Sequence, residues 1–310
     1  MASDHLPVLT AQIVDLLTPA APGLLVDATV GLGGHAGALL WEDPGFFLVG
    51  LDRDPRALAR AGERLRVFGE RVRLVEATLD HLPSVLEDLN LEPPAAVLAD
   101  LGCSSLQLDD AERGFSFSAD GPLDMRMGSE GETAAELLER VEWEELVTIL
   151  RDYGEERRAG AIARAIVKGR EQSPLRTTGE LSRLVQKVVG GRGGRIHPAT
   201  RTFQAIRIAV NDELGQLERF LEPAARALRP GGRIAVISFH SLEDRIVKHG
   251  FRRLAGRCTC PPGLPVCRCD PQRLVTVITT SAVRPDEDEV ARNPRARSAR
   301  LRVAERRKEG

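Results

Sequence analysis

The chain has 310 residues, with 43 lysines and arginines against 45 aspartates and glutamates and a formal net charge of −2. At roughly 100–200 residues per domain, this length predicts one large domain or two unequal ones. The sequence lacks an apolar run of the ~20 residues that span a bilayer, a signal-peptide pattern at its start, and an even-numbered cysteine framework. These features exclude a membrane protein and a secreted mini-protein, and we expect a cytoplasmic enzyme.

Short apolar segments rich in Val and Leu alternate with helical patterns in the first hundred residues. Strands are expected at residues 24–30, 46–52, 72–78 and 95–101, and residues 55–67 repeat Leu and Ala at helical spacing. Strands that alternate with helices indicate a parallel sheet with right-handed crossovers. We therefore predict an α/β fold with a doubly wound, Rossmann-like sheet.

The pattern changes from about Asp109, where a glycine-rich loop leads into helical spacing without strand runs. The α/β pattern returns with a predicted helix at 202–228 and then with predicted strands at 233–239, 274–280 and 300–304. An insertion of this size is long enough to fold as a unit. We predict that residues 109–208 form an inserted all-helical domain, and that residues 1–108 and 209–310 form the α/β domain.

Charge is unevenly distributed along the chain. Residues 109–156 hold 15 acidic and 4 basic side chains, a net of −11, whereas residues 157–207 have a net of +10 and residues 291–310 a net of +6. Basic blocks in a near-neutral chain can form a cationic surface for a polyanion. Charged helices that only cover their solvent faces are the alternative explanation.

The first predicted strand runs into the glycine turn Asp27–His35, and the second ends in Asp52. A strand, a glycine turn, a helix and an acid after the second strand together predict an adenosine cofactor whose ribose hydroxyls meet the acid. A dinucleotide would place its pyrophosphate near Asp27, and no Lys or Arg lies between Ala11 and Glu42. The sulfonium and ammonium of S-adenosylmethionine suit this acidic turn better than NAD(P) does.

The fourth predicted strand delivers Asp100 and then Ser104. Ligands bind at the carboxyl ends of parallel strands, so Asp100 should face the reactive end of the cofactor. An amine that accepts a methyl group needs acceptors for its N–H bonds, and Asp100 could supply one while Ser104 holds the base. Asp100 could instead only bind the cofactor. Cys103 is expected to be a packing residue.

Several long motifs resemble the MraW/RsmH family, bacterial S-adenosylmethionine-dependent methyltransferases of small-subunit (16S) ribosomal RNA. Together they cover nearly the whole chain in order. The matching segments are His5–Leu9, Asp27–His35, Leu51–Pro55, Asp100–Asp110, Glu112–Phe117, Gly121–Met127 (GPLDMRM), Tyr153–Arg157, His197–Ile208 (HPATRTFQAIRI), Ile237–Lys248 and Asn293–Arg306.

The resemblance implies methylation of the N4 amine of a cytidine in the decoding region of the small ribosomal subunit. The partner would be the ribosomal RNA itself or the assembled subunit. Carried over by position, the cofactor contacts fall on Gly33, Gly34, His35, Asp52, Leu79, Asp100 and Gln107. Leu79 stands at a site that is often aromatic in the family, so it keeps an apolar wall but loses stacking.

The substrate side, carried over in the same way, includes Asp109, Arg201, Arg207 and His240. Arg201 and Arg207 could meet phosphates, although a solvated face is an equal alternative for Arg201. His240 follows the fifth strand, where the target base should enter, and capping of the next helix is its other possible role.

Four cysteines, Cys258, Cys260, Cys267 and Cys269, lie within twelve residues. They could hold zinc, although paired C-x-C spacing is tighter than the common C-x₂-C knuckle; free thiols in a proline-rich loop are the alternative. The family does not depend on this cluster. Two other functions stay open for the chain: an oxidoreductase on the same fold, and a non-catalytic RNA-binding or assembly factor that keeps an adenosine pocket.

Overall fold

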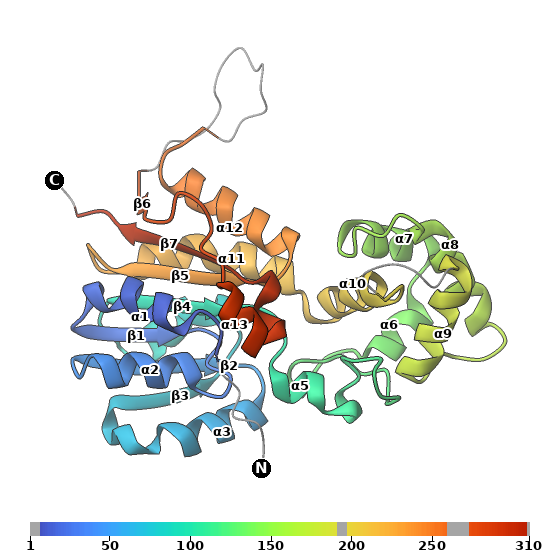
Figure 1. The fold of residues 1–310 in the computed structure, drawn as a ribbon, viewed down its shortest axis with the longest axis horizontal. Helices are drawn as coiled ribbons and strands as arrows, with labels where there is room; N and C mark the ends of the chain where they lie inside the picture. Colours follow the sequence, from blue (N-terminus) through green and yellow to red (C-terminus); the bar gives the residue numbers. More distant parts are fainter. Residues whose placement is uncertain (1–6, 191–196, 259–272, 309–310) are drawn as a thin grey trace. The chain divides into compact units, whose positions relative to one another are not determined.

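The computed structural model describes residues 7–190, 197–258 and 273–308, and these divide between two compact units. One unit consists of Met1–Gly102 and Leu214–Gly310, and the other of Cys103–Glu213. In Figure 1 the first unit carries the blue and the orange-to-red segments, and the second unit carries the green and yellow ones. The predicted insertion at residues 109–208 falls inside the second unit.

The first unit is built on a seven-stranded sheet in the order β3-β2-β1-β4-β5-β7-β6. Strands β3, β2, β1, β4 and β5 are parallel, and β7 is antiparallel to both β5 and β6. The prediction of a doubly wound, mostly parallel sheet is confirmed. The strands are β1 (Gly23–Asp27), β2 (Phe46–Asp52), β3 (Val72–Glu76), β4 (Ala96–Asp100), β5 (Arg233–Ser238), β6 (Val275–Val277) and β7 (Arg300–Arg306).

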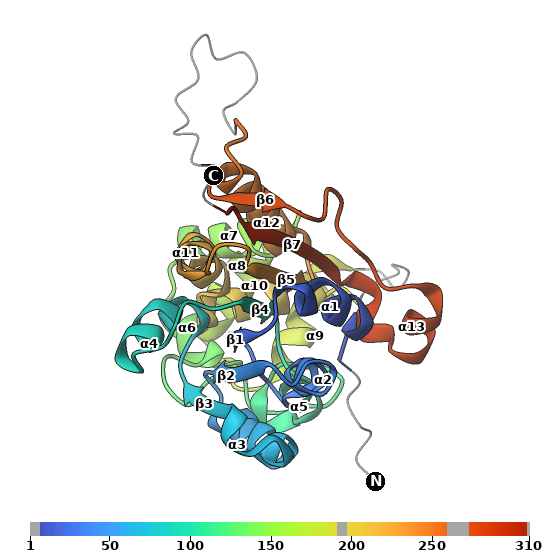
Figure 2. The same ribbon diagram turned by 90° about the vertical axis from the view of Figure 1, so that its left-hand side faces the viewer.

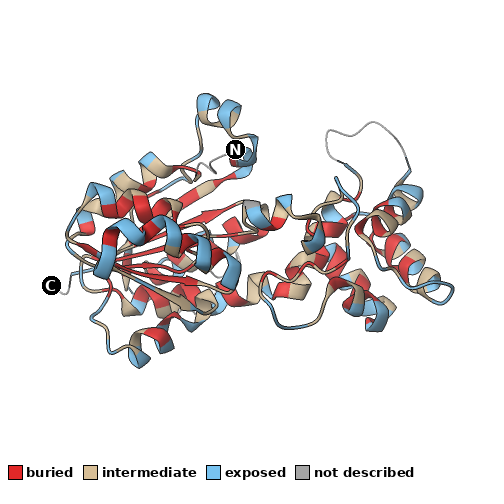
Figure 3. Ribbon diagram, turned by 90° about the horizontal axis from the view of Figure 1, so that it is seen from below, coloured by how far each residue is buried: buried red, intermediate tan, exposed pale blue. Residues whose placement is uncertain are grey.

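Helices cover both faces of this sheet because its strands are apolar on both sides, as buried parallel strands are. In β4, Ala96 and Leu98 join one core, whereas Val97 and Ala99 join the other. The strands are accordingly buried and the outer helix surfaces exposed (Figure 3). The first core contains α1 (Thr10–Leu17), α2 (Gly34–Glu42) and α3 (Pro55–Leu65); the second contains α4 (Leu82–Asp88), α11 (Glu213–Ala227) and α12 (Ser241–Leu254). Figure 2 shows the sheet between these two layers.

Three neighbouring parallel strands end in a carboxylic acid: β1 in Asp27, β2 in Asp52 and β4 in Asp100. The carboxyl ends of parallel strands lie at one edge of a sheet. The chain also reverses its winding direction between β1 and β4, and ligands of such sheets bind in the crevice at that point. The fold therefore places the three acids where a ligand is expected.

The second unit is helical, as predicted, and packs around its own apolar core. Thr133 and Thr177 form capping boxes with Glu136 and Glu180, which satisfy the first amides of α6 and α9. Its helices are α5 (Ser105–Asp109), α6 (Ala134–Arg140), α7 (Trp143–Asp152), α8 (Ala159–Arg170), α9 (Thr178–Val189) and α10 (Thr200–Asn211). Across the described ranges of the chain, no helix is long and apolar enough to cross a membrane.

The single helix predicted at residues 202–228 is wrong, because the structure breaks it into α10 and α11. The break is at Asp212, whose φ of 49° is left-handed and cannot continue a right-handed helix. Aspartate tolerates this conformation better than most residues. The break also coincides with the junction at which the chain leaves the helical unit.

Asn211, at the end of α10, holds the loop that contains the GPLDMRM motif. Its Nδ2 donates to the carbonyl of Met125 at 2.8 Å, and its Oδ1 accepts from the amide of Met127 at 2.8 Å. Asn211 is 2% exposed, so water cannot replace these bonds. One side chain therefore fixes two backbone groups of a loop in which Met125 has a left-handed φ of 62°.

We predict that Asn211→Ala destabilises the protein by about 2–4 kcal/mol, because it leaves buried backbone donors and acceptors without partners. Urea denaturation measures the loss. Gln172→Ala, at an exposed position of the same unit, is the matched control and should change stability by less than about 0.5 kcal/mol. Equal stability of the two variants would contradict the role given to Asn211.

Candidate functional site

The turn after β1 is left-handed in places and closely packed by neighbouring side chains. Gly31 and Gly33 have φ of 52° and 73°, which glycine adopts at little cost. A Cβ on Gly33 would lie 3.0 Å from Leu65, and one on Gly34 would lie 2.9 Å from the ring of Pro7. Helix α2 begins immediately after this turn. The left-handed backbone and the close neighbours explain why glycine is needed at these positions.

The amides of this turn are already bonded to carboxylates of the protein. The Gly31 amide donates to Oδ2 of Asp52 at 2.9 Å, and the Thr29 amide donates to Oδ1 of Asp27 at 3.2 Å. A phosphate-binding turn would need such amides for its ligand. The arrangement consequently disfavours a pyrophosphate and agrees with the predicted preference for a cofactor other than a dinucleotide.

In the part of the chain that the structure describes, the carboxylate of Asp100 accepts no hydrogen bond. Its backbone amide donates to Oγ1 of Thr29 at 2.6 Å, which fixes the end of β4 beside the glycine turn. Its Oδ1 is buried and has no hydrogen-bond partner among the described residues. Its Oδ2 lies 3.6 Å from Nδ1 of His35, beyond hydrogen-bond distance. Oδ1 is therefore available to accept from a donor on a bound ligand.

His35 does not neutralise Asp100. The ring is 6% exposed, and its Nε2 lies 2.7 Å from the carbonyl oxygen of Val8. Because a carbonyl only accepts, Nε2 carries the proton in this pair. Burial lowers the pKa of His35, so the ring is neutral and its Nδ1 presents a lone pair toward Asp100. His35 thus ties the N-terminal segment to the site without supplying charge.

All three strand-end acids have raised pKa values because burial disfavours their charged forms. Burial raises the pKa of Asp100 to about 7, and the nearby charge of Glu243 adds to the effect. Burial raises the pKa of Asp27 to about 7, although the hydrogen bond from the Thr29 amide opposes the increase. It raises that of Asp52 to about 6, although amide hydrogen bonds oppose the increase. Acids in this state favour a cationic ligand, which would stabilise their ionised forms.

Leu79 begins a short 3₁₀ turn, Leu79–His81, after β3 and packs against the second core while remaining partly exposed. It follows the strand next to β2, which carries Asp52. An apolar side chain here is consistent with the predicted wall for a flat ring.

The structure places Ser104 and Gln107 together in the helical unit, at the start of α5. The Ser104 hydroxyl accepts from the Gln107 amide, and Oε1 of Gln107 accepts from the Ser104 amide at 2.9 Å, forming a capping box. Gln107 also donates to the carbonyl of Met127 at 3.1 Å. Both predicted site residues therefore have a local structural role, which the S-x-x-Q spacing could have shown. Asp109 ends α5 and is exposed.

Arg201 and Arg207 both lie on α10 but in different surroundings. Arg201 is exposed. Arg207 forms a bidentate pair with Glu213, with its Nε 2.8 Å from Oε1, and also donates to the sulfur of Cys103 at 3.3 Å. Its guanidinium already has a carboxylate partner, so the phosphate contact predicted for Arg207 stays a prediction. Burial raises the pKa of the Cys103 thiol, which is consistent with a packing role.

His240 is the N-cap of α12, the role that the sequence analysis gave as its alternative. Its Nδ1 accepts from the Glu243 amide, and its Nε2 lies 3.1 Å from Oε1 of Glu243. Asp244, one residue further on, accepts from Arg302 and Arg300 of β7 at 2.7 and 2.8 Å. The proposed cysteine cluster lies outside the described residues except for Cys258, which is exposed.

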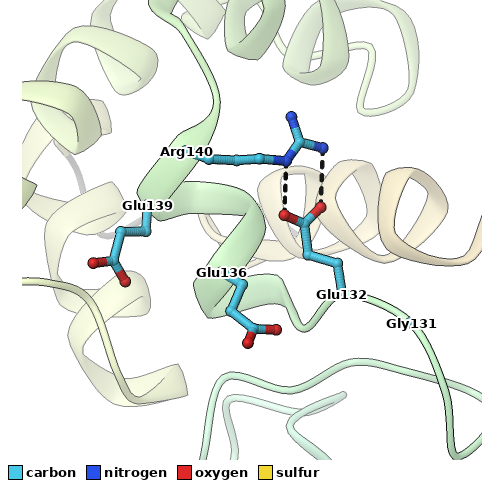
Figure 4. A pocket seen from close by; sticks show the side chains of 5 residues that line it. All are labelled: Gly131, Glu132, Glu136, Glu139 and Arg140. Carbon is cyan, nitrogen blue, oxygen red and sulfur yellow. Dashed lines mark hydrogen bonds and ion pairs between the residues drawn. The ribbon is translucent and has the colours of Figure 1, made fainter.

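The helical unit also contains a cavity of about 610 Å³ lined by Gly131, Glu132, Glu136, Glu139 and Arg140. In Figure 4 the Arg140 guanidinium bridges to the Glu132 carboxylate, and the other two glutamates point away from this pair. The Arg140–Glu132 bond is 2.7 Å long. Glutamates dominate the lining, so this cavity is unsuited to a phosphate. The acidic stretch at 109–156 is used partly in such local pairs and helix caps.

Sequence reasoning missed Thr29 and Glu289. Thr29 links the glycine turn to Asp100, as described above. Glu289 accepts from the Leu9 amide at 2.6 Å and so anchors the N-terminal segment that covers Gly34. Thr29 lies inside the matched turn, so its hydroxyl was a visible signal. Glu289 is 280 residues from Leu9, and no local pattern could have paired them.

We predict that the effect of Asp27→Asn on the free energy of unfolding of the ligand-free protein depends on pH. The substitution should be more favourable to stability at pH 8 than at pH 5, by about 1–3 kcal/mol. Because the folded-state pKa is raised, ionisation of Asp27 costs stability progressively as pH rises from about 4 through 7. Asparagine keeps the acceptor for the Thr29 amide but carries no charge. Urea denaturation at both pH values measures the difference.

Asp80→Asn is the matched control for this pH dependence. Partial burial tends to raise the pKa of Asp80, but hydrogen bonds from Thr78 and Arg219 outweigh it and hold the pKa below its ordinary value. Ionised Asp80 therefore contributes its full stabilisation at both pH 5 and pH 8. The substitution should lower the free energy of unfolding by the same amount at each pH. A pH-independent effect of Asp27→Asn would contradict the buried-charge account.

Comparison with known proteins identifies the family of this chain. The family model described as "MraW methylase family" matches residues 2–307. The chain is 52% identical to the ribosomal RNA small subunit methyltransferase H of Anaeromyxobacter dehalogenans, over 97% of each chain. It is 51% identical to the protein of the same name in Symbiobacterium thermophilum, over 98% of this chain and 96% of that one. The chain therefore belongs to the MraW methylase family.

Proposed function

We propose that this protein transfers a methyl group from S-adenosylmethionine to the N4 amine of a cytidine in the decoding region of small-subunit (16S) ribosomal RNA. Its relatives at about half identity are named as small-subunit ribosomal RNA methyltransferases, and the motifs resemble enzymes of that specificity. The observation that carries the proposal is the buried Oδ1 of Asp100, which lies at the switch point and has no hydrogen-bond donor among the residues that the structure describes. A cytoplasmic location is part of the same proposal.

The residues around the glycine turn fit the methyl donor. Gly33 and Gly34 add no side chain to the turn at the start of α2, and Asp52 would accept hydrogen bonds from the ribose hydroxyls. Leu79 supplies an apolar wall for the adenine. Asp100 would accept from the α-ammonium group, which is the donor that its buried oxygen lacks. S-adenosylmethionine, when bound, supplies an electrophilic methyl group on its sulfonium sulfur.

The protein's own task is to position the amine and to accept hydrogen bonds from its N–H groups. Asp100 lies at the end of β4, where the backbone continues through Leu101 to Gly102 with a φ of 96° at the glycine. The carbonyl groups of this turn are acceptors suited to an exocyclic amine. Because Asp100 is assigned to the donor's ammonium group, these backbone acceptors are assigned to the target amine.

The helical unit carries exposed cationic side chains that could contact RNA. Arg164, Lys168, Lys187 and Arg201 are exposed, and within the described part of the chain none of them has a carboxylate partner. Cationic side chains of this kind bind phosphates and make affinity dependent on salt. We therefore propose that the helical unit recognises the RNA substrate.

An oxidoreductase is disfavoured because the turn amides that a dinucleotide would need are bonded to Asp27 and Asp52. The remaining alternative is a non-catalytic RNA-binding or assembly factor. Mass spectrometry of nucleosides distinguishes it from the enzyme, using small-subunit RNA and assembled subunits that lack the modification. Incubation with protein and S-adenosylmethionine should produce N4-methylcytidine on at least one of the two. A complete absence of new methylcytidine would favour the non-catalytic RNA-binding or assembly factor.

We predict that Asp100→Asn weakens S-adenosylmethionine binding by about tenfold or more, because a charge-assisted bond to the ammonium is worth about 1.5–3 kcal/mol. Titration calorimetry measures the affinity, and single-turnover kinetics at saturating donor measures the chemical step. Asp15→Asn, at an exposed position of α1, should leave both unchanged. A slower chemical step with unaltered donor affinity would instead place this carboxylate at the target amine.

The donor should bind more tightly as pH rises from 5.5 to 7. The pKa of Asp100 is about 7 before binding, so a bound cation must displace a proton, and affinity should rise by up to about tenfold per pH unit. The donor's α-ammonium stays charged in this range, since α-amino groups titrate near about 7.7–8.0. Calorimetry in buffers of different ionisation enthalpy should detect proton release. A pH-independent affinity would contradict this linkage.

A further inference from the structure

A cavity of about 280 Å³ in the first unit is lined by three arginines, Arg284, Arg297 and Arg300. It lies between the end of β5, the start of α12 and the segment that leads into β7. Ser241 and Ser298 also line it, and no acidic residue is among its lining residues. We call it the arginine pocket. No role described above uses it, although His240 contributes to its wall.

The arginine pocket carries uncompensated positive charge. Arg300 donates to Asp244 at 2.8 Å, but Asp244 is shared with Arg302. Arg284 and Arg297 are exposed and have no carboxylate partner in residues 7–190, 197–258 or 273–308. One carboxylate thus serves two arginines, and two further guanidiniums at the pocket remain without an acid.

Three other arginines of the C-terminal basic block, Arg292, Arg302 and Arg306, are used structurally. Arg302 pairs with Asp244 as above, and Arg306 donates to the carbonyls of Ala225 and Arg226 at the end of α11. Arg292 donates to the carbonyl of Asp288 within its own helix. Interactions within the protein therefore account for only some of the positive charges in residues 291–310. Arg297 stands apart because it faces a cavity and lacks such a partner.

The pocket lies at the edge of the sheet that also carries the strand-end acids. Ile237 of β5 is in register with Asp100 of β4, and the pocket wall begins at Phe239, just beyond the end of β5. Neighbouring strands are about 4.8 Å apart. The pocket is consequently within reach of a nucleotide adjacent to a base that enters beside Asp100.

We propose that the arginine pocket binds a backbone phosphate of the RNA next to the target nucleotide. This inference rests on the proposed function. Guanidinium groups match phosphate oxygens in pairs and keep their charge at any physiological pH. The amides of Phe239 and His240 are bonded to Glu243, so the arginines supply the attraction. The volume lies below the roughly 300–1,000 Å³ of drug-sized ligand pockets, which suits a single phosphate.

The double variant Arg284→Ala/Arg297→Ala tests this proposal. Fluorescence anisotropy with labelled small-subunit RNA, measured over a range of salt concentrations, should show binding weakened by about tenfold or more. The slope of log affinity against log salt should become less steep by about 0.7 per lost phosphate contact, the value for single strands. The affinity for S-adenosylmethionine should not change, because neither arginine is assigned to the donor.

Arg66→Ala/Arg73→Ala is the matched control. It removes the same charge from exposed positions on and beside β3, within the first unit but at the opposite end of the strand order. It should leave the RNA affinity and salt slope close to those of the wild-type protein. Arg284→Lys/Arg297→Lys keeps the charge and should restore the salt slope while recovering only part of the affinity.

Several outcomes would overturn the proposal. Wild-type affinity and salt slope in the alanine double variant would do so, as would an equal loss in the control pair. A defect seen with assembled subunits but not with naked RNA would mean that the pocket takes an acidic protein segment. If the wild-type protein bound no small-subunit RNA, the proposed function would fail together with the pocket proposal. If the wild-type protein bound RNA and the alanine double variant bound it equally well, only the pocket proposal would fail.

Discussion

The site depends on a shortage of cations around three carboxylates at the ends of adjacent parallel strands. The carboxylates of Asp27 and Asp52 have a structural role, since each accepts a hydrogen bond from a backbone amide of the glycine turn. Asp100 differs, because its buried Oδ1 has no donor among the described residues and burial lowers the pKa of its neighbour His35. Burial raises the pKa values of all three acids. Such an arrangement costs stability without a ligand and becomes favourable when a cation binds.

The surrounding structure holds these acids in place through contacts that are distant in sequence. The N-terminal segment covers the glycine turn because Pro7 packs on Gly34. It is fixed by two hydrogen bonds, one between the carbonyl of Val8 and His35 and one from the amide of Leu9 to Glu289. Rigid positioning of this kind is what methyl transfer requires, since the reaction depends on alignment more than on activation of the methyl group.

Charge in this protein divides between structural and available groups. In the acid-rich stretch, Glu136 caps a helix and Glu132 pairs with Arg140. Among the arginines, Arg302 and Arg306 bond to the protein itself. Arg201 on the helical unit and Arg297 at the arginine pocket are exposed and have no such bond within the described ranges. Net charge by segment could not make this distinction, because it depends on which side chains the fold brings together.

The sequence by itself determined the layered α/β fold, the glycine turn and its strand-end acids, because each follows from a local pattern of apolar residues, glycines and charges. Its long motifs also identified the family. Tertiary structure decided the break at Asp212, the pairing of Arg207 with Glu213 and the insertion of β7 between β5 and β6. It also decided that Oδ1 of Asp100 lacks a donor among the described residues and that Arg284 and Arg297 share one cavity. These features depend on contacts between residues far apart in the chain, and local patterns carry no record of them.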